Sequence, residues 1–280
     1  MRACLYGGRV TQSPEPTAVS DPAGAVREPT VTGLPDGYTY GVTRYADIIL
    51  QQAFPTQFED IVTVLSSFRI NLGELRVGGG GRTVFVSRFD GALEARGWGK
   101  KTIEIGKTID GKLITNVRGH EIDMFSVGSE ADPYPGIAVE MEWNNKDPFY
   151  DRDLLNYQAL HREGALGVGV IITRGAVLQS LLERTVLHAG ARTSKYGKAS
   201  THWNKLVPRV NLGGGGECPL LLIGIEPPRI DGGDIFIRAM EKFRLADELK
   251  RNWRGKHGSR AEAALEAEHM IEAGYALLES

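Results

Sequence analysis

Three acidic residues have the spacing expected of metal ligands on two neighbouring β-strands. Glu140 and Glu142 are two positions apart in an apolar run, so both side chains point to one face of a strand. Asp123 lies in a second predicted strand and could converge on the same place. Carboxylates gathered in this way repel one another, and their pKa values rise unless a cation compensates them. Carboxylate oxygens suit Mg²⁺, so we predict that Asp123 and Glu140 are metal ligands.

A metal site of this kind would suit the hydrolysis of a phosphodiester bond. A bound ion polarises the scissile phosphate, lowers the pKa of a bound water and stabilises the departing 3′-oxygen. Glu142 is then the candidate for orienting or deprotonating the attacking water. An exposed strand with a merely acidic outer face has the same spacing, because glutamate is mostly exposed in proteins. The spacing by itself leaves both interpretations open.

Four short β-branched runs between residues 101 and 143 are predicted to begin a sheet. Asp110-Gly111 is a favourable hairpin turn between the first two of them. Two fully buried strands follow further along the chain, and predicted helices alternate with them. These elements predict an α/β protein with a central mixed β-sheet flanked by helices. The predicted strands are 102–105, 113–117, 121–125, 137–143, 168–173 and 220–225.

Helices are predicted on both sides of the acidic strands. The sequence TQFE at 56–59 has the form of a capping box and predicts the start of one helix. Asp147 is predicted to cap another helix, which has Pro148 at its first position and ends at Gly164. Residues 1–40 are rich in Pro, Gly, Ser and Thr and are predicted to form an irregular N-terminal arm. Further helices are expected at 85–97, 176–187, 235–253 and 260–278.

Residues 121–174 resemble the PD-(D/E)xK nucleases, and among them the BamHI/BglII/BstYI-like type II restriction endonucleases. Their sequence is EIDMFSVGSEADPYPGIAVEMEWNNKDPFYDRDLLNYQALHREGALGVGVIITR. The family pattern is an Asp on one strand, an acid-x-(Lys, Glu or Gln) on the next, a helix and an apolar strand, and Asp123 and Glu140-Met141-Glu142 match its first two parts. FDGALEARGW at 89–98 and CPLLLIGIEP at 218–227 are similar to the flanking segments of these enzymes. Glu142 stands where Lys is more common, which leaves the identity of the general base open.

The resemblance implies a restriction-endonuclease-like fold, with residues 41–280 as a single endonuclease domain and a catalytic core at about 100–227. It implies Mg²⁺-dependent cleavage of double-stranded DNA at a short palindromic site by a homodimer, in a prokaryotic cytoplasm, with a cognate DNA methyltransferase encoded nearby. The dimer could use helices from 45–72 or from 148–163, and the resemblance favours the second. Two alternatives remain open, namely a repair or recombination nuclease of the same fold and a sequence-specific DNA-binding protein that does not cleave.

A basic window between residues 184 and 216 contains no Asp or Glu and is the predicted phosphate-binding surface. Asn and Lys side chains after the acidic strand could read base edges, and the resemblance nominates Asn145, Asp147 and Arg152 for DNA contact. Asp147 could instead act only as a helix cap, Glu183-Arg184 could be a surface ion pair, and the basic window could be a solvated loop. The candidate DNA-binding residues are Asn144, Asn145, Lys146, Asp147, Arg152, Arg174, Glu183, Arg184, Arg192, Lys195, Lys198, His202 and Lys205.

Several other classes of function lack the residues they require. The formal net charge is −2, so a polyanionic partner must be held by local charge placement. Two cysteines and six scattered histidines provide neither a disulfide framework nor a zinc site. The glycine runs at 78–81 and 213–216 do not match a nucleotide-binding motif, and no apolar run is long enough to span a membrane.

Overall fold

A computed structural model describes residues 24–76, 82–188, 196–255 and 258–279. Its centre is a six-stranded mixed sheet with the strand order β1-β9-β8-β7-β6-β3, in which β7, β8 and β9 are parallel and the other pairs antiparallel. This confirms the predicted α/β class. The strands are β1 (Tyr38–Val42), β3 (Gly99–Lys101), β6 (Ile122–Ser126), β7 (Gly136–Met141), β8 (Leu166–Arg174) and β9 (Leu220–Ile225).

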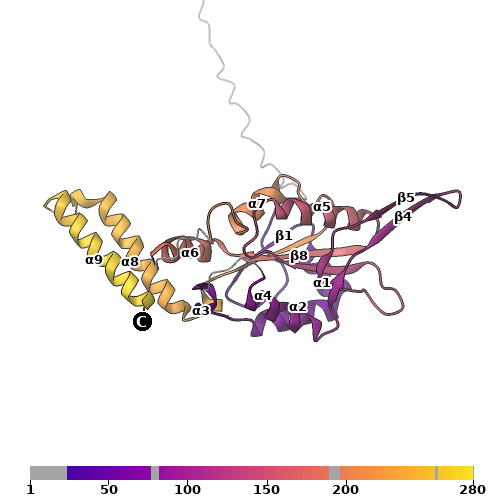
Figure 1. Cartoon of the computed structure of the whole chain (residues 1–280), viewed down its shortest axis with the longest axis horizontal. Helices are drawn as coiled ribbons and strands as arrows, with labels where there is room; N and C mark the ends of the chain where they lie inside the picture. The colour runs from indigo at the N-terminus through magenta and orange to yellow at the C-terminus, as the bar shows by residue number, and fades with distance from the viewer. Residues whose placement is uncertain (1–23, 77–81, 189–195, 256–257, 280) are drawn as a thin grey trace, which may run out of the picture.

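Helices cover both faces of this sheet (Figure 1). Side chains alternate along β7, so Ile137, Val139 and Met141 pack into one apolar cluster and Ala138 into the other. The first cluster includes α1 (Ala46–Ala53), α2 (Pro55–Ser67), α4 (Val84–Glu94) and α6 (Ala176–His188), and the second includes α5 (Phe149–Arg162) and α7 (Trp203–Asn211). The remaining short elements are β2 (Ile70–Asn71), α3 (Leu72–Arg76), η1 (Pro227–Arg229), β10 (Ile230–Asp231) and η2 (Trp253–Gly255).

Two hairpins project from this core (Figure 1). The helices α8 (Gly233–Arg251) and α9 (Arg260–Glu279) pack on each other at one end of the molecule. The strands β4 (Glu104–Ile109) and β5 (Lys112–Arg118) form a separate two-stranded sheet. Asp110 and Gly111 adopt positive φ angles of 50° and 77° at its turn, which confirms the predicted hairpin. The expectation that these strands belong to the central sheet is wrong, because most of their residues are exposed and apart from the layered core.

Some predicted element boundaries are wrong. β1 begins at Tyr38, inside the predicted arm, and pairs with β9, whereas residues 1–23 lie outside the described residues. α2 begins at Pro55 with Phe54 at its N-cap, so the TQFE sequence lies within the helix and does not start it. α5 begins at Phe149 and has no side-chain cap, because Asp147 instead makes ion pairs with Lys205 and Arg209. Among the described residues, no helix is long and apolar enough to cross a membrane.

Candidate active site

The predicted acids meet where β6 and β7 lie side by side. The backbone N–H of Asp123 donates a hydrogen bond to Glu140 Oε1 at 3.2 Å, so the two acids are in direct contact across the strands. Glu142 lies just beyond β7, where its N–H donates to the Ile172 carbonyl oxygen at 2.9 Å and extends the strand pairing. Met141 and Trp143 pack in the first apolar cluster. Glu140 and Glu142 therefore share the opposite face, as strand periodicity predicts.

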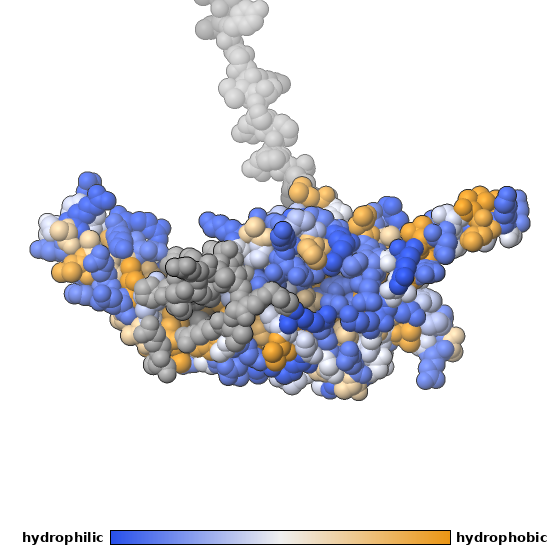
Figure 2. Space-filling view, in the orientation of Figure 1, coloured by the Kyte–Doolittle hydropathy of each residue, from blue (hydrophilic) through white to orange (hydrophobic). Residues whose placement is uncertain are grey.

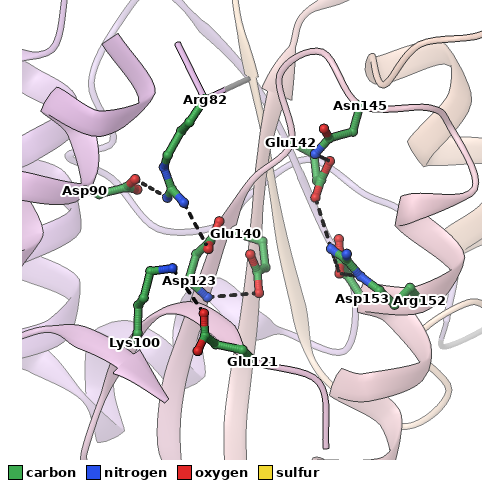
Figure 3. A network of polar contacts seen from close by, with 10 residues as sticks. All are labelled: Arg82, Asp90, Lys100, Glu121, Asp123, Glu140, Glu142, Asn145, Arg152 and Asp153. Carbon is green, nitrogen blue, oxygen red and sulfur yellow. Dashed lines mark hydrogen bonds and ion pairs between the residues drawn. The ribbon is translucent and has the colours of Figure 1, made fainter. Parts of the chain in front are cut away.

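A fourth acid, Asp153, approaches this site from α5 and was missed by the sequence reasoning (Figure 3). Its side chain is only 1% exposed. Asp153 shares the buried face of α5 with Tyr150, Leu154 and Tyr157, which are spaced as the apolar stripe of a helix. An aspartate within such a stripe is a signal that could have found it, because a buried carboxylate needs a partner.

Arg152 and Asn145 hold Glu142 in place (Figure 3). The Asn145 side-chain amide donates to Glu142 Oε2 at 2.7 Å. The Arg152 guanidinium lies 3.4 Å from Glu142 Oε1 and 2.7 Å from Asp153 Oδ1, and it stacks over the Phe149 ring at 4.6 Å. Glu142 thus has a fixed orientation, and Arg152 is the one cation paired with it among the residues that the structure describes.

Burial raises the pKa of every acid on this side of the site. Loss of solvent raises the pKa of Glu140 well above its usual value, and the charges of Asp153 and Asp123 add to the effect. Burial, followed by the charge of Asp153, raises the pKa of Glu142 to about 8. Burial also raises the pKa of Asp153, although Arg152 opposes the shift. Glu142 therefore holds a proton near neutral pH until a cation compensates it, and burial disfavours the charged forms of Glu140 and Asp153 as well.

A second arginine, also missed by the sequence reasoning, lies on the Asp123 side. Arg82 Nη1 donates to Asp123 Oδ1 at 3.2 Å, and Arg82 Nη2 pairs with Asp90 of α4 (Figure 3). Lys100 lies close by and pairs with Glu121 at 3.0 Å. The side chains of Arg82 and Asp123 are 35% and 28% exposed, so this pair faces solvent more than Glu142 does.

The donor set suits a hard divalent cation, although the ligands are not preassembled. Among the described residues, no group of three His, Cys, Asp or Glu side chains is placed to hold a metal ion. Arg82 neutralises Asp123, and Arg152 and Asn145 hold Glu142, whereas Glu140 makes no ion pair within the described part of the chain. Asp123 and Glu140 offer hard carboxylate oxygens from adjacent strands, and burial disfavours the charge of Glu140 unless a cation compensates it.

The loop after β7 carries the candidates for DNA contact beside this site. Asn145 and Lys146 are exposed, and Asn144 and Asp147 are partly exposed. This loop pairs with residues 199–201, because Asp147 N–H donates to the Ala199 carbonyl oxygen and Thr201 N–H to the Asn145 carbonyl oxygen. The pairing brings exposed Lys198 close to the same loop. Lys205 is half-buried and lies 3.5 Å from Asp147.

Two residues expected to touch DNA are buried instead. Arg174 is fully buried, donates to Ser200 Oγ at 2.6 Å and to the Thr201 carbonyl oxygen at 2.7 Å, and lies over the Tyr196 ring. His202 is 6% exposed. The structure therefore corrects the expectation of direct DNA contacts by these side chains, and Arg174 supports the loop that contains Ser200.

The remaining candidates have no described side chains. Glu183 and Arg184 lie on α6, of which only the backbone is described at these positions. Arg192 and Lys195 lie outside the described residues. Their predicted contacts with DNA stay predictions.

The central mixed sheet with helices on both faces defines an α/β protein of restriction-endonuclease-like fold. Residues 38–225 match the model of the family described as restriction endonuclease BglII/BglIII, which is more than half of the chain. The chain therefore belongs to this family and is a type II site-specific deoxyribonuclease that acts on double-stranded DNA. A search of curated proteins found no match. The matched region contains the sheet and all the acids described above, whereas α8 and α9 lie beyond it.

Proposed function

We propose that this restriction endonuclease cleaves both strands of a short palindromic site in a Mg²⁺-dependent reaction, with Asp123, Glu140 and Glu142 as its catalytic acids. The observation that carries the proposal is the contact between Asp123 and Glu140 on adjacent strands, where burial disfavours the charge of Glu140. Asp123 and Glu140 would hold the ion through carboxylate oxygens. A bound Mg²⁺ would polarise the scissile phosphate and lower the pKa of a bound water.

Glu142 is proposed to accept the proton of the attacking water. Without a bound cation, Glu142 holds a proton near neutral pH because burial raises its pKa to about 8; a bound cation would lower that pKa and leave the carboxylate free to accept a proton. Asn145 donates to one of its oxygens and Arg152 lies beside the other, which restricts the carboxylate to one orientation. In the PD-(D/E)xK pattern that the chain resembles, Lys is more common at the position of Glu142, and Arg152 places a positive charge 3.4 Å from Glu142.

We propose a homodimer in which α5 lies near the two-fold axis, because a palindromic site presents the same half-site to each subunit. Leu155 of α5 is 66% exposed, which favours this helix as a contact surface. Asn145, Lys146 and Lys198 are proposed to contact the bases and phosphates from the paired loops next to the catalytic acids. A cognate DNA methyltransferase would protect the host site from an enzyme of this specificity.

Digestion of plasmid DNA with and without Mg²⁺ tests the proposal. Discrete fragments with defined ends, read by sequencing, are expected with Mg²⁺ only. Glu140→Ala should abolish cutting and leave specific DNA binding in a gel-shift assay. Glu121→Ala is the matched control, because Glu121 is a neighbouring acid that is about half exposed and pairs with Lys100 outside the cluster. Metal-independent cutting, or full activity of Glu140→Ala, would contradict the proposal, and smears or nicks would favour a repair nuclease.

A further inference from the structure

Arg82 bridges two acids at the open side of the site. One end of its guanidinium contacts Asp123, the proposed metal ligand, and the other contacts Asp90. We infer that Arg82 occupies the cation position beside Asp123 in the metal-free protein and leaves it when a divalent ion binds. This inference rests on the proposed function, since it takes Asp123 as a ligand of that ion.

The charges around Asp123 favour such an exchange of cations. Asp123 Oδ1 accepts a hydrogen bond from Arg82 at 3.2 Å, so this oxygen is already engaged with a positive charge. A divalent ion that binds Asp123 and Glu140 brings two further positive charges to the same place. Like charges repel, so the guanidinium and the ion compete for Asp123.

The surroundings of Arg82 allow it to move without losing its anchor. Asp90 is buried, with 8% of its side chain exposed, and stays paired to the second end of the guanidinium. Arg82 itself is 35% exposed. A cavity of about 280 Å³ lies against Arg82 and Asp123 and is also lined by Trp143 and Asn145. The guanidinium can therefore turn from Asp123 into this space, next to the loop proposed to contact DNA.

Lys100 provides a matched comparison. Its ammonium group pairs with Glu121 at 3.0 Å, and it lies close enough to Asp123 for their charges to interact. It makes no contact with Asp123. Removal of Lys100 therefore takes away a nearby positive charge without opening the ligand position, whereas removal of Arg82 does both.

The test is a calorimetric Mg²⁺ titration of the DNA-free protein, which needs no activity. Arg82→Gln should bind Mg²⁺ about fivefold more tightly than the unmodified protein, the factor expected for release of a partly exposed ion pair. Lys100→Gln should change the affinity by less than about twofold, because its exposed charge is screened. Arg82→Lys, which keeps the charge but loses the two-ended contact, should fall between the unmodified protein and Arg82→Gln.

Unchanged or weaker binding by Arg82→Gln would overturn the inference, as would an equal gain in Lys100→Gln. Plasmid cleavage separates this outcome from failure of the proposed function. If the unmodified protein cuts with Mg²⁺ but Arg82→Gln shows no gain in affinity, only the inference fails. If Arg82→Gln gains affinity but neither the unmodified protein nor any variant cuts DNA, the proposed cleavage fails, whereas metal binding at Asp123, the part of the proposal on which the inference rests, is retained.

Discussion

The two sides of the acidic cluster have the same kind of ion pairing but differ in how far their acids are exposed to solvent. On each side one arginine bridges two acids, Arg82 with Asp123 and Asp90, and Arg152 with Glu142 and Asp153. Both arginine side chains are 35% exposed. The acids differ, because Glu142 is 4% exposed and Asp123 is 28% exposed.

The difference separates a fixed charge pair from an exchangeable one. Glu142 has Asn145 as an additional partner, and Arg152 is stacked on Phe149, so this side holds its geometry. Arg82 has a neighbouring cavity and a solvent-facing acid, so its contact can be replaced. Glu142 is buried and depends strongly on Arg152, since a buried charge without a partner is costly. Asp123 is more exposed, so its contact with Arg82 can be exchanged for another ligand.

The largest effect is expected from Glu142→Gln. This change removes the proposed proton acceptor and keeps the shape of the side chain. The single-turnover cleavage rate should fall by about 10²- to 10⁴-fold, the usual contribution of general-base catalysis, while DNA affinity stays close to normal. Quench-flow cleavage and a gel-shift titration measure the two quantities. A Glu142→Gln variant that cuts at the normal rate would show that Glu142 is not the proton acceptor.

Arg152→Ala should produce the next largest effect. Loss of the guanidinium removes the only positive charge paired with Glu142 in the described structure, so the pKa of Glu142 rises further. Because the pKa of Glu142 is higher in this variant, the increase of the cleavage rate with pH should occur at higher pH than in the unmodified protein. Arg152→Lys should keep part of the charge and give a smaller shift. An unchanged pH profile in Arg152→Ala would show that this arginine does not control Glu142.

The stability of the metal-free protein should fall as pH rises from about 5 to about 8. The pKa of Glu142 is raised from 4.5 to about 8, so between these values the folded protein binds more protons than the unfolded chain. A state that binds more protons loses stability as pH increases, and the raised pKa of Glu140 acts in the same direction. Thermal unfolding at several pH values measures the trend, and Glu142→Gln should weaken it. A transition temperature that rises over this range would contradict the burial of these acids as protonated groups.

The smallest effect is expected from Asp147→Ala, which probes a third bridge at the surface. Arg209 pairs with Asp147 at 3.4 Å and with Asp151 at 2.9 Å, and the side chains of Arg209, Asp147 and Asp151 are 24%, 20% and 60% exposed. Asp147 makes no helix cap, so the free energy of unfolding should fall by about 1 kcal/mol or less, the range of exposed ion pairs. Urea denaturation measures this change. A loss well above that range would mean that this partly exposed pair contributes as much to the stability of the fold as a buried one.

Much of the fold follows from the periodicity of the apolar residues. The runs at 168–173 and 220–225 are almost entirely apolar, and the run at 137–143 is apolar apart from Glu140 and Glu142. All three became central strands, because strands covered on both faces bury nearly every side chain. The pair Asp110-Gly111 specified a hairpin because both residues tolerate positive φ angles. Neither the apolar periodicity nor the turn sequence indicates which sheet a hairpin joins. The prediction that β4 and β5 belong to the central sheet is therefore wrong.

The sequence by itself determined which face of β7 carries Glu140 and Glu142, since alternation along a strand is a local property. It also determined the family, because Asp123 and the acid-x-Glu sequence appear in the expected order. Only the tertiary structure decided which other charged side chains lie beside these acids. Arg82 is 41 residues from Asp123, and Asp153 reaches Glu142 from a helix, so their proximity depends on how the layers pack. The burial that raises the pKa of Glu142 likewise belongs to the packed molecule, because desolvation comes from neighbours that are distant in sequence.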